Sequence, residues 1–130
     1  MDIASYIDED ADIHHIFPQT YCERKNLPRI KWNSVINKTP IYASSNRSIG
    51  GHAPSIYIGT MANKGLMQVQ IQEAIESHKI NYAHLVSDDF NAYFIDRAKQ
   101  LLDRIEIATG KSVSGRDSEE TIREFGFSLI

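Results

Sequence analysis

The sequence is poor in the residues that mark several common protein classes. Its 130 residues include one cysteine, one tryptophan and four prolines. A lone cysteine, Cys22, excludes an internal disulfide and any zinc site built from four cysteines. No apolar run approaches the roughly 18–20 residues of a membrane-spanning helix, so we expect no membrane partner. The first twelve residues hold five acids and no base, so we expect no targeting peptide and a cytoplasmic location.

Positive charge is scarce overall but concentrated in one segment. The chain has 14 Lys and Arg against 17 Asp and Glu, a net charge of −3. This balance argues against a protein that coats nucleic acid through bulk positive charge. Between Gln19 and Arg47, however, a single acid, Glu23, faces six bases: Arg24, Lys25, Arg29, Lys31, Lys38 and Arg47. Such a run is usually only a solvated surface, but this one directly follows a pair of histidines.

Length and pattern predict one α+β domain over residues 1–130. Residues 12–18 are typical of a strand that Pro18 stops. Residues 19–31, polar and interrupted by a proline, are expected to form a loop that contains Cys22 without a role for it. A turn near Asn37 and a strand over 39–42 follow. Ser44 or Ser45 is expected to cap a short helix that ends before Gly50.

Helices are predicted over most of the remaining chain. Pro54 suits the first turn of a helix that runs to about residue 61, and a second helix is expected over 66–80. The clearest helix spans 87–109, with Ser87 as the cap and Gly110 closing it. Its expected core stripe is Phe90, Phe94, Ala98, Leu101, Ile105 and Ala108. Residues 118–125 predict a short capped helix.

The residues suited to chemistry are His14, His15, Asn37 and Asn46. They follow the order strand, basic loop, second strand and short helix. Adjacent strand residues point to opposite faces of a sheet, so both histidines serve one site only if the strand ends or bulges there. Pro18 favours an early end.

Three stretches together resemble a known family. They are DIHHIFP at 12–18, INKTP at 36–40 and SSNRSIGGHAPSIY at 44–57. The pattern resembles the ββα-metal motif of HNH endonucleases, the His-Me finger family. It is more similar still to the C-terminal HNH domain of GmrSD-type Type IV restriction enzymes. The resemblance implies a small ββα-metal core over about 11–60, followed by a helical tail over about 64–130.

The resemblance also implies roles for individual residues. His15 would be the general base that activates water, and Asn37 would fix the loop and orient that base. His14 and Asn46 would hold one divalent metal ion. The expected phosphate contacts are Arg47, Lys38, Lys31 and Arg29.

The implied chemistry is hydrolysis of a DNA phosphodiester bond. A neutral imidazole, with a pKa of roughly 6.5, can take a proton from water near neutral pH. Mg²⁺ or Mn²⁺ is the expected metal, and an imidazole ligand also suits Zn²⁺ or Ni²⁺. The family further implies a role in restriction and phage defence, with a nucleotide-hydrolysing ParB-like domain or subunit as a partner. The alternative is a non-catalytic DNA-binding or protein-interaction module with a vestigial metal site.

Overall fold

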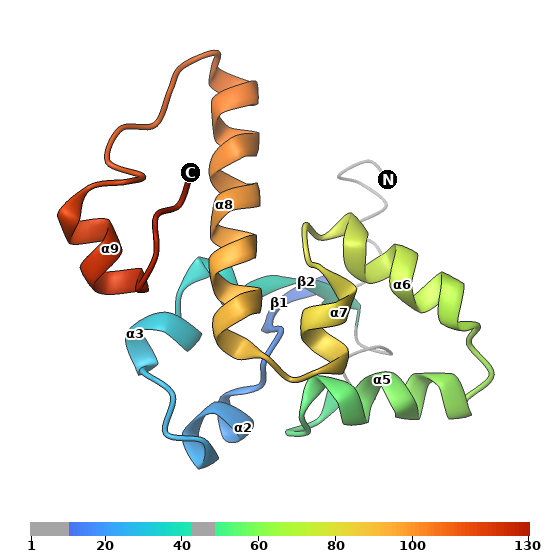
Figure 1. Ribbon diagram of the computed structural model, residues 1–130. Helices are drawn as coiled ribbons and strands as arrows, with labels where there is room; N and C mark the ends of the chain where they lie inside the picture. The colour runs from blue at the N-terminus through green and yellow to red at the C-terminus, as the bar shows by residue number, and fades with distance from the viewer. Residues whose placement is uncertain (1–10, 43–48) are drawn as a thin grey trace.

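The computed structural model describes residues 11–42 and 49–130 and shows a mixed, mostly helical fold with one small sheet (Figure 1). The sheet is two-stranded and antiparallel. Its strands are β1 (Ala11–His15) and β2 (Lys38–Tyr42), and between them lie α2 (Gln19–Arg24), α3 (Arg29–Trp32) and the 3₁₀ helix η1 (Val35–Asn37). The elements after β2 are α5 (Pro54–Asn63), α6 (Gln68–Ser77), α7 (Tyr82–Val86), α8 (Phe90–Thr109) and α9 (Glu119–Phe125).

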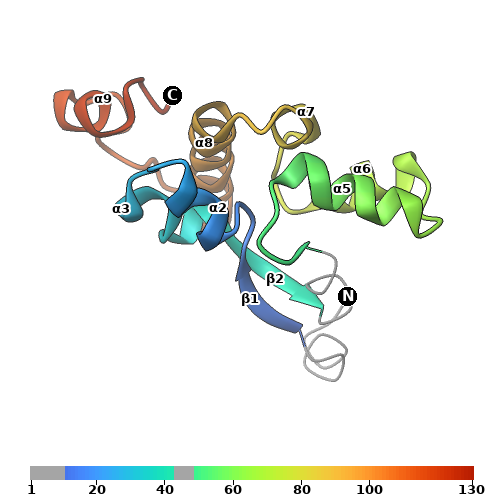
Figure 2. The ribbon, with the colours of Figure 1, turned by 90° about the horizontal axis from the view of Figure 1, so that it is seen from below.

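The β1–β2 hairpin lies between two groups of helices. Its register pairs Ala11 with Tyr42 at one end and His15 with Lys38 at the other. Figures 1 and 2 show α2 and α3 on one side of the hairpin and α5 and α6 on the other. Both predicted strands are confirmed, with β1 ending at His15 rather than at Pro18. The predicted helix capped by Ser44 or Ser45 lies outside the described residues.

The core is centred on an aromatic side chain just beyond β1. Phe17 is fully buried, and its ring centroid lies 4.8 Å from that of Tyr93 and 5.3 Å from that of Phe90. The hydroxyl of Tyr57 in α5 donates to the carbonyl of Ile16 at 2.9 Å. Helices α5 and α8 are therefore both fastened to the segment that leaves the histidine pair.

A buried amide joins the hairpin to α3 and α8. The fully buried Asn37 side chain makes four hydrogen bonds within the fold. Its Oδ1 accepts from the Phe17 amide at 2.9 Å and from the Tyr93 hydroxyl at 3.0 Å. Its Nδ2 donates to the carbonyls of Phe17 and Trp32, both at 2.9 Å. Both lone pairs and both protons of the amide are used, which is its full capacity.

Arg97 of α8 fastens the same region from a second direction. The side chain is buried, and its described hydrogen bonds all go to backbone carbonyls. Nη1 donates to Ile36 and to Lys38, the latter at 3.0 Å, and Nε donates to His78 at 3.2 Å. Spreading the guanidinium charge over several carbonyls satisfies its donors without a carboxylate. The start of β2 is thereby tied to the middle of α8.

The first turn of α5 is capped from a distant part of the chain. Asp88 lies between α7 and α8 with a positive φ of 53°. Its two carboxylate oxygens accept from the Ser55 amide at 2.9 Å and the Ser55 hydroxyl at 2.6 Å. A carboxylate is favourable at this position because the first amides of a helix lack partners within it.

Local sequence signals predicted several helix ends correctly. Pro54 occupies the first turn of α5, Ser118 caps α9 through the Thr121 amide at 3.2 Å, and Gly110 closes α8 in the left-handed conformation. The predicted helix over 66–80 is confirmed as α6 with shorter ends.

Residues 19–31 do not form the loop that their polar sequence predicted. They contain α2 and begin α3, both too short to be stable by themselves. Helix α2 is held by burial of Tyr21 and Cys22, so Cys22 is a core residue. Its Sγ donates to the Phe17 carbonyl, and burial raises the pKa of the thiol to about 12.

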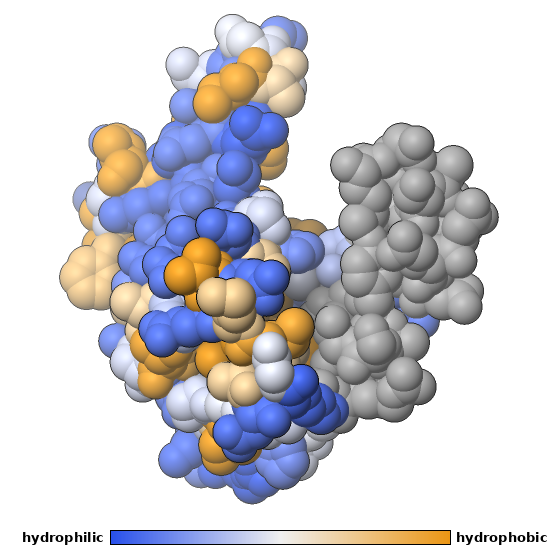
Figure 3. Space-filling model, turned by 90° about the vertical axis from the view of Figure 1, so that its right-hand side faces the viewer, coloured by the Kyte–Doolittle hydropathy of each residue, from blue (hydrophilic) through white to orange (hydrophobic). Residues whose placement is uncertain are grey.

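The long C-terminal helix begins later than predicted, and part of its stripe is exposed. Ser87 follows the unpredicted α7, and Asp89 caps α8 by accepting from the Ala92 amide at 3.1 Å. Phe90, Phe94 and Ala98 are buried as expected, whereas Ile105 and Ala108 are exposed. The last turns extend beyond the core in Figure 1, which removes their packing partners. Figure 3 shows further hydrophobic residues among hydrophilic ones on the α5–α6 face, where Leu66, Met67 and Val69 are exposed.

We predict that Asn37→Ala lowers the free energy of unfolding by about 3 kcal/mol or more, because it leaves several buried polar groups without partners. Urea denaturation followed by circular dichroism measures this change.

Asn91→Ala, at an exposed position of α8, is the matched control and should change stability by less than about 0.5 kcal/mol. Equal stability losses in the two variants would contradict the role of the buried amide.

Candidate functional site

The histidine pair lies where β1 ends. His15 is the last strand residue, and the chain bends at residues 16 and 17 before α2 begins. The Ile16 amide still donates to the Asn37 carbonyl at 2.9 Å, so a hydrogen bond holds the bend against the end of η1. The early strand end that Pro18 predicted is therefore present.

The two histidines leave the strand on opposite faces. In the register, His14 is paired with Thr39 and His15 with Lys38. Paired residues of an antiparallel sheet share a face, and successive residues alternate between faces. Both imidazoles are partly exposed. They flank the outer edge of β1, which has β2 as its neighbour in the described two-stranded sheet.

His15 lies against the end of α3. Its Nε2 is 3.1 Å from Oδ1 of Asn33, and its ring meets the Trp32 ring edge-on at a centroid distance of 5.6 Å. On the same tryptophan, the Arg29 guanidinium carbon is 6.0 Å from the ring centroid. Asn33 was not predicted as a site residue, because it lies between the loop expected over 19–31 and the turn expected near Asn37, where no local pattern distinguishes one asparagine from another.

On the face of His14, a further histidine, His78, bonds to the residue paired with His14. This residue, Thr39, is buried, and the Thr39 hydroxyl hydrogen-bonds Nδ1 of His78 at 2.7 Å. Burial lowers the pKa of His78 below its ordinary value, and the positive charge of Arg97 lowers it further. The neutral form of His78 is therefore the one that the fold favours.

Asn37 is too deep in the fold to meet a substrate. Its amide is fully used by Phe17, Trp32 and Tyr93, so it has no hydrogen bond left for His15. The role that the resemblance implies for Asn37, fixing the loop and orienting the base, stays a prediction. Through its side chain Asn37 holds the backbone of Phe17 and Trp32, and the Trp32 ring contacts the imidazole of His15.

The predicted metal ligands are described only in part. Of the two ligands, His14 is within the described residues and Asn46 lies outside them. Arg47, a predicted phosphate contact, also lies outside the described residues. Over residues 11–42 and 49–130, no group of three or more His, Cys, Asp or Glu side chains could hold a metal ion. One imidazole and one amide would suit a weakly held, largely hydrated Mg²⁺ or Mn²⁺ better than a four-ligand structural zinc.

The predicted phosphate contacts lie in different places. Arg29 stands beside Trp32, and Lys38 shares a hairpin face with His15. Lys31 turns towards α8, where its Nζ is 5.9 Å from the Phe94 ring centroid. Lys38 is therefore the register partner of His15, and Arg29 lies beside the tryptophan whose ring contacts His15.

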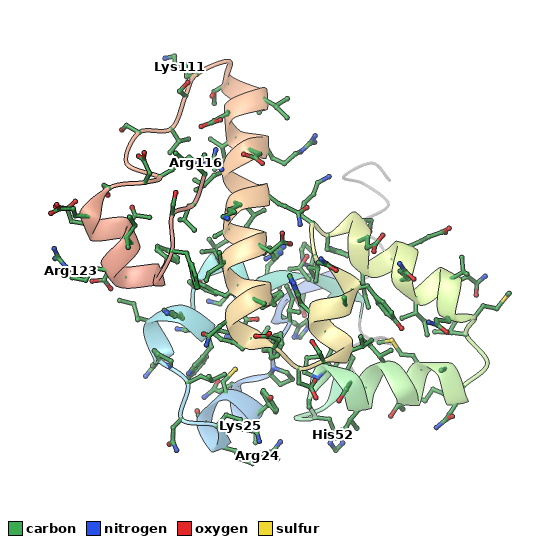
Figure 4. All side chains as sticks on the ribbon, viewed as in Figure 1. Arg24, Lys25, His52, Lys111, Arg116 and Arg123 are labelled. Atoms are coloured by element: carbon green, nitrogen blue, oxygen red, sulfur yellow. The ribbon has the colours of Figure 1, made fainter. Side chains whose placement is uncertain are left out.

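Further basic residues lie in two other parts of the fold, at the end of α2 and around the far end of α8 (Figure 4). Arg24 and Lys25 at the end of α2 lie near His52, and Arg24 donates to the Gly51 carbonyl at 3.4 Å. Around the far end of α8, Arg116 is neutralised by Asp103 at 2.8 Å and Glu106 at 3.1 Å.

A polar hollow of about 320 Å³ lies between α6 and α8. Its lining includes the carboxylates of Glu76 and Asp96, which would repel a phosphate. This hollow is therefore unsuited to nucleic acid.

Comparison with known proteins identifies a relative but no activity. No protein-family model matches the chain, and no solved structure matches it significantly. The uncharacterized protein MJ0686 of Methanocaldococcus jannaschii is 30% identical over an alignment of 125 residues, and the match covers 79% of this chain. The chain spans 21% of the length of that protein. Among the described residues, no helix has the length and apolar character to cross a membrane.

We predict that stability falls as the pH is lowered through about 6.5, the ordinary pKa of histidine. Because the pKa of His78 is lowered in the folded chain, the unfolded chain binds this proton more readily. The contribution is complete above about pH 6.5 and is lost below it. Urea denaturation between about pH 7.5 and pH 5.5 measures the effect.

His78→Asn should flatten this pH dependence, whereas the matched control His52→Asn, at an exposed position, should leave it unchanged. An identical pH dependence in wild type and His78→Asn would refute the assignment.

Proposed function

We propose that this chain is a metal-dependent DNA endonuclease of the HNH type with a small ββα-metal core. The observation that carries the proposal is the antiparallel hairpin whose first strand ends at His14 and His15, with Trp32 and Asn33 in contact with His15 and Arg29 beside Trp32. The order of its sequence motifs supports the same family.

His15 is the general base in this proposal. Its imidazole takes a proton from water, and the water oxygen attacks the phosphorus atom. The bond from phosphorus to the 3′ oxygen breaks, and the leaving oxygen takes a proton from solvent. A divalent cation held by His14 and Asn46 would supply charge neutralisation at the phosphate and the leaving oxygen. Asn37 contributes as a positioning residue through the backbone that it holds.

The position of the phosphate follows from the two faces of the hairpin. His14 and His15 leave β1 on opposite sides of its outer edge, so we infer that the scissile phosphate binds across this edge. Arg29 and Lys38 would contact phosphates on the His15 side. Lys31 and Arg47 complete the proposed contacts, with Lys31 directed towards a more distant part of the DNA. Such contacts supply affinity without sequence preference.

The wider role is also a proposal. The longer archaeal relative supports the idea that such a domain works within a larger protein. Resemblance to GmrSD-type enzymes suggests restriction of foreign DNA in the cytoplasm, with a nucleotide-hydrolysing ParB-like domain or subunit controlling specificity.

A second function is favoured by two observations. The opposite faces of His14 and His15, together with the fully used amide of Asn37, suit a non-catalytic module that binds DNA or protein and keeps a vestigial metal site. Cleavage assays separate the two functions.

We predict that the purified chain nicks supercoiled plasmid with Mg²⁺ or Mn²⁺ and that EDTA abolishes the nicking. Loss of a general base typically costs about 10²- to 10⁴-fold in rate, so His15→Ala should lower the nicking rate by this factor. Gel electrophoresis of the plasmid forms measures it.

His52→Ala, which removes an exposed imidazole outside the proposed site, should cleave at the wild-type rate. Nicking that survives both EDTA and His15→Ala would eliminate the proposed mechanism. A folded chain that binds DNA without cleaving it with any metal would favour the second function.

We further predict that Arg29→Ala weakens DNA binding more than Lys31→Ala does. Arg29 lies beside Trp32, whose ring contacts His15, whereas Lys31 packs over Phe94. Each phosphate contact contributes to the salt dependence of affinity, so Arg29→Ala should lower the slope of log K against log salt by about 1. Fluorescence anisotropy with a labelled duplex in EDTA measures binding separately from cleavage, and equal slopes in the two variants would contradict this placement.

A further inference from the structure

His15 and Asn33 are in contact, and the backbone of each is held by its own element of secondary structure. Nε2 of His15 is 3.1 Å from Oδ1 of Asn33, a hydrogen-bond distance. Asn33 is the residue that ends α3, and its backbone amide donates to the Arg29 carbonyl at 2.9 Å. The backbone under this side chain is therefore fixed by the helix, even though the side chain itself is exposed.

The imidazole is also restrained by the ring of Trp32, which is itself held by the core. Trp32 is buried and meets the His15 ring edge-on at 5.6 Å. The Trp32 carbonyl accepts from Nδ2 of Asn37 at 2.9 Å. Contacts thus run from the buried amide of Asn37 to Trp32, from Trp32 along the backbone to Asn33, and from Asn33 to His15. The end of α3 is held at a fixed place beside β1.

The direction of the hydrogen bond decides which nitrogen of His15 is basic. A neutral imidazole has one N–H and one bare nitrogen, and the partner of one nitrogen sets the state of the other. With the Asn33 oxygen facing Nε2, this nitrogen carries the proton and donates it. Nδ1 then holds the free lone pair. The reverse arrangement, with the Asn33 amino group donating to a bare Nε2, would place the proton on Nδ1.

We propose that Asn33 is a positioning residue that holds His15 in the tautomer with the proton on Nε2, which leaves Nδ1 as the atom that accepts a proton from water. This inference rests on the proposed function for the use of Nδ1, but not for the hydrogen bond itself. The amide of Asn37 is fully used within the fold and cannot hydrogen-bond His15. The positioning role is therefore assigned to Asn33, which lies outside the three stretches that carry the family resemblance.

Two substitutions test the direction of the hydrogen bond. Asn33→Asp keeps an oxygen at this position and removes the amino group, so it supports the proton on Nε2 and cannot stabilise the reverse arrangement. Asn33→Ala removes both groups. Asn91→Ala, at an exposed position of α8, is the matched control.

The tautomer is read from long-range ¹H–¹⁵N spectra of the full chain at about pH 8, without metal or DNA. We expect a protonated Nε2 and a bare Nδ1 in wild type and Asn33→Asp, and a shift towards a mixture of tautomers in Asn33→Ala. A proton on Nδ1 in wild type overturns the proposal. So does a tautomer ratio that is the same in wild type and Asn33→Ala.

Cleavage supplies the second measurement. Loss of a group that orients a reacting side chain typically costs about 10- to 100-fold, so kcat should fall by this factor in Asn33→Ala with KM unchanged, and Asn33→Asp should recover most of it. If the expected tautomers are found in a chain that cleaves no DNA, the proposed function fails and the positioning contact stands. If Asn33→Ala cleaves at the wild-type rate, the positioning role fails and the proposed function stands.

Discussion

The side-chain amide of Asn37 is the interaction on which the rest of this structure depends. It joins the segment that leaves β1, the end of α3 and the first turn of α8 at one buried point. In a water-excluded interior an unpaired polar group is costly, so each of these groups stabilises the others only while all are present. Arg97 reinforces the junction by binding the carbonyls of Ile36 and Lys38. The two chain segments that bear His15 and Asn33 leave this junction in fixed directions.

This arrangement separates the groups that hold the site from those that could perform chemistry. The saturated amide of Asn37 and the aromatic rings around Phe17 lie inside, where they are rigid and dry. The imidazoles of His14 and His15 lie at the end of the hairpin, partly open to solvent. A short strand that ends immediately after two histidines lets one backbone segment supply a side chain to each face of the sheet. The buried residues keep this edge in place without meeting a substrate.

The sequence predicted those features that depend on neighbouring residues. Pro54, Gly110 and Ser118 act within their own helices, and their positions were correct. The strand around His14 and His15 was also found, because isoleucine, phenylalanine and proline are strong local signals. Helices α2 and α3 were missed because their stability comes from the burial of Tyr21, Cys22 and Trp32 in a core assembled from distant segments.

The candidate site was predictable in its composition but not in its connections. His15 and Asn37 were both singled out, yet the partners of Asn37 include Tyr93, 56 residues further along the chain. Local sequence patterns carry no information about such a contact, so the saturation of the amide could not be foreseen. Asn33 was not singled out because its contact with His15 depends on α3, and the polar sequence of that segment does not predict a helix. Asn46 and Arg47 remain predictions, since they lie outside the described residues.

The capping of α5 by Asp88 has a consequence for the order in which the chain acquires its shape during synthesis. The Ser55 amide binds the carboxylate of Asp88, which lies 33 residues downstream and is therefore synthesised later. The hairpin has the same dependence on α8, through Tyr93 and Arg97. A ribosome-bound chain that has just produced α5 therefore contains both histidines together with Trp32, Asn33 and Asn37, but lacks Tyr93 and Arg97, which bind Asn37 and the start of β2. The hydrogen bonds of the buried junction are complete only after α8 has emerged, so a prematurely terminated chain would carry the motif without this part of its support.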